Sequence, residues 1–216
     1  MYDNERKVLA DAGRELMNRR LSVGTWGNIS IRVEQNKCLI TPSGMNYQKL
    51  GPTDMVLIDL EGKVVEGKWK PSSEKMLHAQ IYNNRDDVDA VIHYHPIFSS
   101  ILSVARYNIP PLIEDSIMLL GGEIKVTDYV FPGGIELAEE AVKALGSNNA
   151  VILANHGAVC VGKDLEKTFA ACDVLEKSAQ IFIFAKLLGK VHLLPQEDVK
   201  KLQELTTGYL NLWEQK

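Results

Sequence analysis

The chain has 216 residues, 45% of them hydrophobic, and 28 acidic against 24 basic residues give a formal net charge of -4. These values predict one globular domain over residues 1–216, without a basic nucleic-acid surface or a polybasic membrane patch. No apolar run reaches the roughly eighteen residues of a membrane-spanning helix. The cysteines form no CxxC pair and the charged start lacks a signal-peptide core, so we expect a reduced, cytoplasmic protein.

Apolar spacing and turn residues predict helices and strands that alternate along the first half of the chain. In chain order we expect a helix at 3–20, strands at 28–33 and 37–40, a hairpin of 56–60 with 64–66, a helix at 73–83 and an apolar strand from residue 88 into His93-Tyr94-His95.

The second half continues with more helices. We expect helices at 97–105, 136–145, 164–188 and 196–213, and one buried strand at 150–154. Several strand pairs are joined by hairpins, which a purely parallel sheet does not allow. The pattern therefore predicts an α/β fold in which a central mixed, largely antiparallel sheet carries helices on both faces.

His93-Tyr94-His95 is the most informative motif for chemistry. Side chains alternate between the faces of a strand, so His93 and His95 point the same way where the strand ends. His156 also directly follows an apolar strand. Three protein ligands with an open position are typical of a catalytic zinc, so we expect a three-histidine metal site. The alternative for the paired histidines is a solvated loop.

Two further side chains belong to the same hypothesis. Glu74 begins the helix after Pro71-Ser72-Ser73, where its carboxylate can act as a fourth, displaceable ligand or as a general base. His78 lies four residues later on the same helix face, and either binds the metal, supports its ligands or packs in the core. His192 is expected in solvent.

Short segments rich in glycine and hydroxyl residues indicate an anion site. They are Gly24-Thr25-Trp26-Gly27-Asn28, Thr41-Pro42-Ser43-Gly44 and Pro71-Ser72-Ser73. Hydroxyls, backbone N–H groups and the start of the following helix favour a phosphate monoester. Neither a Walker loop nor a dinucleotide fingerprint is present. Each segment alone fits an ordinary turn, but beside a metal site they predict a small phosphorylated substrate.

The combined motifs resemble those of a known family. The segments 24–30, 40–44, 70–74, 93–95 and 155–157 occur in the order seen in zinc-dependent class II sugar-phosphate aldolases of the fuculose-phosphate aldolase type. L-Ribulose-5-phosphate 4-epimerase and the adducin head domain belong to the same superfamily. The resemblance implies a three-layer α/β/α sandwich and a cyclic homotetramer with active sites between subunits.

The resemblance also implies roles for single residues. His93, His95 and His156 would bind Zn²⁺, or another divalent metal such as Mn²⁺ or Co²⁺, and Glu74 would be the acid/base that also reaches the metal. The phosphate would be held by a set of loop residues: Asn28, Ser43, Gly44, Ser72 and Ser73, with Thr25 nearby.

Three features bear on the reaction within the family. Aldolases of this type carry glutamate after Pro-Ser-Ser, as this chain does at Glu74, whereas the epimerase has aspartate there. Trp26, in contrast, is shared with the epimerase. Near 113–116 the aldolase has a catalytic tyrosine, and this chain offers Glu114 or Asp115 instead. The family's second tyrosine lies near the C-terminus, where Tyr209 is the candidate.

The resemblance implies a metal-dependent lyase. The expected reaction cleaves a ketose 1-phosphate to dihydroxyacetone phosphate and a short aldehyde through a metal-stabilised enediolate. The same enediolate serves a 4-epimerase and a sugar-acid phosphate decarboxylase or dehydratase, so these stay open. The alternative of another class is an adducin-like oligomerising module, but adducin-like proteins lack the metal-binding set.

Overall fold

The fold is built around one seven-stranded sheet with strand order β4-β3-β2-β1-β5-β7-β6. The computed structural model describes the backbone of residues 1–213 and the side chains of residues 1–206. The strands are β1 (Asn28–Glu34), β2 (Lys37–Ile40), β3 (Val56–Asp59), β4 (Val64–Glu66), β5 (Ala90–Tyr94), β6 (Ala150–Leu153) and β7 (Gly157–Gly162). Neighbouring strands are antiparallel throughout, and a parallel contact occurs at the isolated bridge of Val126 with Ile152.

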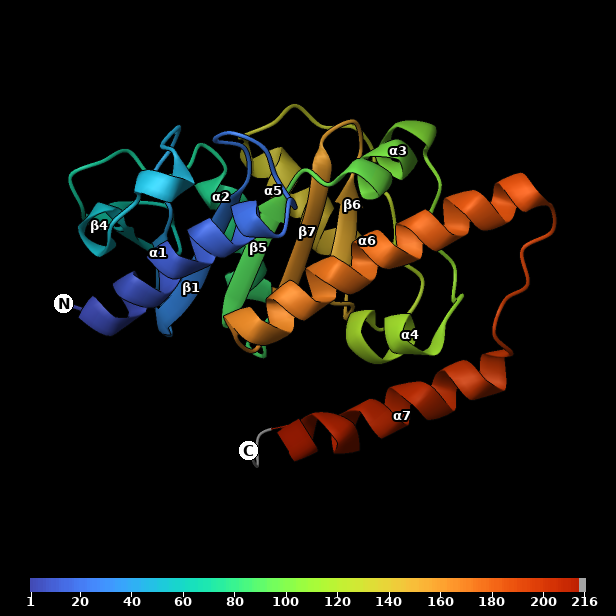
Figure 1. The fold of residues 1–216 in the computed structure, drawn as a ribbon. Coiled ribbons are helices and arrows are strands. Elements are labelled where there is room, and N and C mark those ends of the chain that lie inside the picture. The colour runs from blue at the N-terminus through green and yellow to red at the C-terminus, as the bar shows by residue number, and fades with distance from the viewer. Residues whose placement is uncertain (214–216) are drawn as a thin grey trace.

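Helices cover both faces of the sheet, as Figure 1 shows. They are α1 (Asp3–Asn18), α2 (Lys75–Asn84), α3 (Ile97–Ala105), α4 (Glu114–Leu120), α5 (Ile135–Leu145), α6 (Leu165–Leu188) and α7 (Gln196–Trp213), with short 3₁₀ turns at Tyr47–Lys49 and Pro52–Asp54. One hydrophobic core joins α1, α3, α4 and α6 to one face of the sheet, and a second joins α2 and α5 to the other. The expected α/β class and its three layers are therefore confirmed.

The alternation of strand side chains separates the two cores. In β5, Ile92 faces the core under α6, whereas Val91 faces the core under α2 and α5. His93 has the same parity as Val91 and is fully buried, so its ring lies on the α2 side of the sheet. Tyr94 points to the opposite face, where its hydroxyl donates to the Cys172 carbonyl at 3.1 Å.

Two elements were not predicted from the sequence. Strand β7 directly follows the Asn155-His156-Gly157 turn and pairs with both β5 and β6. Its first and last residues, Gly157 and Gly162, resemble loop residues in the sequence. Helix α4 has only 7 residues, too few for a periodic apolar pattern. None of the described helices is long and apolar enough to cross a membrane.

Antiparallel pairing brings distant motifs to one end of the sheet. Asn28 at the start of β1 lies opposite His93 near the end of β5, and Tyr94 lies opposite Ala158 near the start of β7. The starts of β1 and β7 therefore meet the end of β5, and this end of the sheet positions the site.

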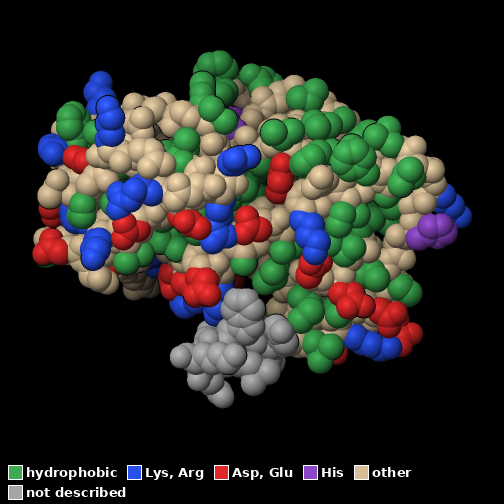
Figure 2. All heavy atoms as spheres, in the orientation of Figure 1, with side chains coloured by type: hydrophobic (Ala, Val, Ile, Leu, Met, Phe, Trp, Pro, Cys, Tyr) green, Lys and Arg blue, Asp and Glu red, His purple; other side chains and the backbone are tan. Residues whose placement is uncertain are grey.

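Apolar side chains also gather on the outside of the molecule. Figure 2 shows them over α3 and the C-terminal half of α6. On α3, Ile97 is 73% exposed and Val104 is 64% exposed, and on α6 Leu187 is 75% exposed. We call the exposed apolar residues of these two helices the α3/α6 patch: Ile97, Ile101, Val104, Phe184, Leu187 and Leu188.

Candidate active site

Three imidazoles converge at the end of the sheet. His93 comes from β5, His95 follows that strand, and His156 lies in the turn between β6 and β7. One nitrogen of each ring lies within 4.8 Å of the others. His93 is buried and the other two are half-buried, so the cluster opens on one side only.

Backbone contacts orient two of these rings. His93 Nδ1 lies 3.0 Å from the Ala158 carbonyl and donates to it, which turns Nε2 toward the other two rings. This Nε2 lies 3.0 Å from His95 Nε2. The His156 turn is held by Ser103 of α3, whose hydroxyl donates to the Leu153 carbonyl at 2.6 Å and accepts from the His156 N–H at 3.3 Å.

The environment keeps two of these imidazoles, those of His95 and His156, neutral. Burial, reinforced by His93, lowers the pKa of His95 to about 3. Burial and the same neighbour lower the pKa of His156 to about 4. A neutral imidazole offers a lone pair, which is the form that binds a metal.

Glu74 closes the cluster. It is the N-cap residue of α2 and only 8% exposed. Its Oε2 lies 3.2 Å from His93 Nε2, and its Oε1 lies 3.3 Å from His156 Nε2. Burial opposes ionisation, but His93, His156 and the Asn28 amide outweigh it and hold the pKa of Glu74 below its usual range.

The residues present fit a divalent metal ion. Tetrahedral ligands at about 2.0–2.1 Å from zinc lie about 3.3–3.4 Å from one another. Three pairs of these atoms are 3.0–3.3 Å apart: His93 Nε2 with His95 Nε2, His93 Nε2 with Glu74 Oε2, and His156 Nε2 with Glu74 Oε1. Glu74 Oε1 and His156 Nδ1 are buried without a hydrogen-bond partner. Buried polar atoms usually have partners, so the unpaired carboxylate oxygen supports a cation at this position.

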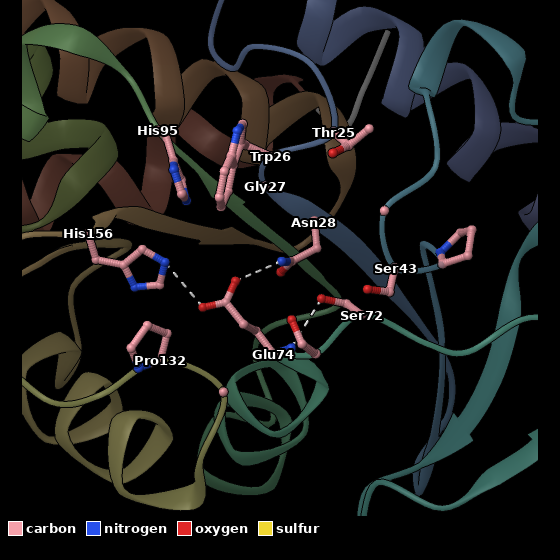
Figure 3. Close-up of a pocket in the computed structure, with 14 residues that line it drawn as sticks. Thr25, Trp26, Gly27, Asn28, Ser43, Ser72, Glu74, His95, Pro132 and His156 are labelled. Carbon is pink, nitrogen blue, oxygen red and sulfur yellow. Dashed lines mark hydrogen bonds and ion pairs between the residues drawn. The ribbon is translucent and has the colours of Figure 1, made fainter.

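The glycine- and hydroxyl-rich loops form the other end of the same cavity. The Ser43 N–H donates to the Lys70 carbonyl at 3.0 Å, and the Ser72 N–H donates to the Thr41 carbonyl at 3.1 Å. These bonds hold Ser43 beside Ser72, at the start of α2. Figure 3 shows Thr25, Ser43 and Ser72 on one side of Glu74 and His95 and His156 on the other.

The first of these loops passes unusually close to the histidine cluster. Gly27 has a positive φ of 83°, and a Cβ there would lie 2.7 Å from the His93 carbonyl oxygen. Tyr47 donates its hydroxyl to the Gly27 carbonyl at 2.8 Å. The Trp26 ring lies 5.7 Å from the His95 ring at 30°, so the indole covers that imidazole.

The cavity has a volume of about 350 Å³ and contains most of the predicted site residues. The predicted residues that line it are Thr25, Asn28, Ser43, Gly44, Ser72, Ser73, Glu74, His95 and His156. Pro132 and Gly133 also line it and were not predicted. The segment Pro132-Gly133-Gly134 carries no ionisable side chain, and its sequence indicates only a turn.

Two polar residues have partners that the sequence did not specify. Asn28, expected at the phosphate, donates Nδ2 to Glu74 Oε2 at 3.0 Å. Its Oδ1 lies 2.5 Å from His78 Nε2. His78 is fully buried, and its Nδ1 lies 2.6 Å from Ser30 Oγ. Both ring nitrogens of His78 are therefore engaged, which places it behind the site and outside the metal cluster.

Glu114 and Asp115, which were expected to decide the reaction, do not line this cavity in the single chain. Glu114 and Asp115 form the first turn of α4, where Asp115 accepts from Lys177 Nζ at 2.5 Å. Tyr209 belongs to α7, and its side chain lies outside the described residues. His192 is exposed, as expected.

Comparison with known families identifies this arrangement. Residues 7–183 match the family described as "Class II Aldolase and Adducin N-terminal domain". The chain belongs to the class II aldolase/adducin family. A solved structure of an L-fuculose 1-phosphate aldolase shares the fold with a TM-score of 0.89 at 35% identity, covering 93% of this chain and 95% of that one.

Relatives within the class II aldolase/adducin family carry different activities in their names. The 5-deoxy-D-ribulose 1-phosphate aldolase of Bacillus thuringiensis serovar kurstaki is 31% identical, covering 97% of this chain and 98% of its own. The L-fuculose phosphate aldolase of Methanocaldococcus jannaschii is 37% identical, covering 86% of this chain and 99% of its own. A 3-oxo-tetronate 4-phosphate decarboxylase of Haemophilus influenzae is 30% identical, covering 92% of this chain and 96% of its own.

Proposed function

We propose that the protein is a metal-dependent aldolase that cleaves a ketose 1-phosphate to dihydroxyacetone phosphate and a short aldehyde. One observation carries the proposal: a buried carboxylate, Glu74, lies between a three-histidine cluster and an anion cradle in one cavity. Cleavage next to a carbonyl needs stabilised negative charge, a proton carrier and a fixed substrate. This cavity offers a group for each task.

The three histidines, with Glu74 as a displaceable fourth ligand, would hold Zn²⁺ or a similar divalent ion. Such an ion supplies Lewis-acid stabilisation of the enediolate left when the carbon–carbon bond breaks. Glu74 would exchange the proton that interconverts the enediolate and the ketone product. Its carboxylate suits this task because it faces the cavity and is held ionised by its neighbours. The Trp26 indole would exclude water from one side of His95.

The substrate phosphate would bind at the hydroxyl end of the cavity. None of the described residues that line it is lysine or arginine. Ser43, Ser72, Ser73 and Thr25 offer hydroxyls there, and α2 begins at this point with the positive end of its dipole. A single phosphate on a small sugar suits this end of the cavity.

The far end of the cavity favours a sugar whose terminal carbon is unsubstituted. Trp26 and Pro132 flank the histidines there. Two of the relatives are named for aldol cleavage of L-fuculose phosphate and 5-deoxy-D-ribulose 1-phosphate. We therefore place the phosphates of deoxyketoses first among the substrates to test.

We also propose a homotetramer. The α3/α6 patch supports it, because exposed apolar patches of this kind mark association surfaces. Helix α3 begins directly after His95 and Pro96, so a neighbouring subunit on this patch would lie close to the cavity. Light scattering at micromolar concentration tests the proposal, and a monomer mass would contradict it.

The second candidate is decarboxylation of a sugar-acid phosphate through the same enediolate. The decarboxylase among the relatives favours it. A 4-epimerase or dehydratase reaction would use the same groups. An adducin-like module without activity is the remaining alternative, and the intact histidine cluster argues against it.

The test is a substrate panel with the zinc-loaded protein. The panel contains L-fuculose 1-phosphate, 5-deoxyribulose 1-phosphate, L-ribulose 5-phosphate and 3-keto sugar-acid phosphates. We expect dihydroxyacetone phosphate from a ketose 1-phosphate, loss of this product after chelation, and recovery with added metal. Release of carbon dioxide or an epimerised sugar without dihydroxyacetone phosphate would replace the proposal by one of its alternatives.

A further inference from the structure

A chain of hydrogen bonds runs from the Glu74 carboxylate into the interface between β1 and α2. Asn28 Nδ2 donates to Glu74 Oε2 at 3.0 Å, and Asn28 Oδ1 lies 2.5 Å from His78 Nε2. His78 Nδ1 lies 2.6 Å from Ser30 Oγ, which lies 2.8 Å from the Tyr82 hydroxyl. These side chains are 0% to 8% exposed, so bulk water does not compete for the bonds.

The chemistry of the partners fixes the direction of every bond. An ionised carboxylate only accepts, so the Asn28 amide must turn its N–H to Glu74 and its oxygen to His78. His78 then donates from Nε2 and accepts at Nδ1 from the Ser30 hydroxyl. The Ser30 oxygen in turn accepts from the Tyr82 hydroxyl. Each donor has one acceptor, and the chain is complete only in this direction.

We propose that His78 is a positioning residue for the chemistry at Glu74. By donating to Asn28 Oδ1, it fixes the amide with its N–H toward the carboxylate. A flipped amide would place its oxygen 3.0 Å from Glu74 Oε2, so that two acceptors face each other without a proton between them. The carboxylate would then turn away from His93 and His156. The consequence for turnover rests on the proposed function, whereas the consequence for metal binding does not.

The ring of His78 suits this role because it stays neutral. Burial, followed by the nearby His93, lowers the pKa of His78 to about 3. The neutral ring has one N–H and one lone pair, which the two neighbours require. A packing role alone would need only the volume of the ring. The test therefore compares substitutions that keep the volume with one that also keeps the donor.

The experiment measures Zn²⁺ affinity by competition with a chelator, together with kcat, KM and the thermal midpoint. His78→Leu keeps volume and removes the donor, and we expect metal affinity to fall about 10- to 100-fold, as for other groups that orient metal ligands. In the active enzyme we expect kcat to fall and KM to change little. His78→Gln retains an N–H near the Nε2 position, so it should restore metal affinity to within about threefold of wild type.

Thr168→Val is the matched control. Thr168 is also fully buried and donates its hydroxyl at 2.6 Å, to the Asp164 carbonyl at the opposite end of β7. The Thr168→Val substitution should lower the thermal midpoint without weakening Zn²⁺ binding. If His78→Leu does not fold, His78→Asn replaces it, because its shorter amide does not reach Asn28.

A Glu74→Gln background separates positioning from a general loss of order. If His78 acts through Asn28 on Glu74, the effects of the two substitutions on Zn²⁺ affinity should not add, because the two sites interact. The double variant Glu74→Gln/His78→Leu should then bind Zn²⁺ less than about twofold more weakly than Glu74→Gln alone. Unchanged metal affinity in His78→Leu, or equal losses in His78→Leu and His78→Gln, would overturn the inference. The two proposals can fail separately. If the wild-type protein cleaves no ketose phosphate but the His78 variants change Zn²⁺ affinity as expected, the proposed function is refuted and His78 remains a positioning residue.

Discussion

Gly157→Ala is the substitution whose effect the structure defines most closely. Gly157 begins β7 beneath the metal cluster, and a Cβ there would lie 2.5 Å from the Tyr94 carbonyl oxygen and 2.8 Å from His95 Cδ2. Real Cβ atoms essentially never approach so closely. The carbonyl belongs to the β5 backbone and cannot rotate away, so either β5 or β7 must shift.

Overpacking of this kind costs about 1–3 kcal/mol of folding free energy. For a domain of this size each kcal/mol lowers the thermal midpoint by about 2–4 °C, so we expect a decrease of about 2–12 °C. His95 must also move away from the added methyl group, and His95 Nε2 lies only 3.0 Å from His93 Nε2. We therefore expect Zn²⁺ affinity to fall at least about tenfold.

Gly122→Ala provides the control, because its Cβ would lie 3.6 Å from the nearest atoms, an ordinary contact. Differential scanning fluorimetry and chelator competition on both variants make the comparison. If Gly157→Ala matches the control within 1 °C and about twofold in affinity, the close approach of β7 to β5 is not a constraint on the site and the reasoning is wrong.

Three further predictions test the site and the assembly. His93→Ala should remove Zn²⁺, measured by elemental analysis, while the circular dichroism spectrum stays unchanged; full occupancy would end the ligand assignment. Glu74→Gln should lower kcat about 10²–10⁴-fold with KM nearly constant, as for a lost general base, and a near-native rate would remove it from the mechanism. Glu114→Gln and Asp115→Asn, assayed for cleavage and epimerisation, should change rate or product more than about twofold if α4 reaches a neighbouring cavity; no change in either variant would assign Asp115 only to its ion pair with Lys177.

Local patterns were sufficient to predict most of the side chains that the fold brings together at the cavity. His93 and His95 share a face because strand side chains alternate, and His156 follows an equally apolar strand. The glycine- and hydroxyl-rich loops were recognisable for the same reason: turn chemistry is encoded within a few residues. The amphipathic helices and most strands follow from spacing alone, and the fold class agrees with the structure.

Elements without a local signal were missed. The strand β7 resembles a loop because it begins and ends with glycine, and α4 is too short for helical periodicity. Pro132 enters the cavity through a loop whose sequence indicates only a turn. In each case the position depends on packing against segments distant in sequence.

The sequence by itself determined which side chains we propose for the chemistry, namely the histidines and Glu74. Only the tertiary structure decided their mutual geometry. The register that sets Asn28 opposite His93, and the amide orientation that joins Glu74 to His78, arise from antiparallel pairing and from packing of α2 on β1. The physical reason is range: propensity and alternation act over a few residues, whereas strand register and buried donor–acceptor matching are fixed by contacts between segments far apart in the chain.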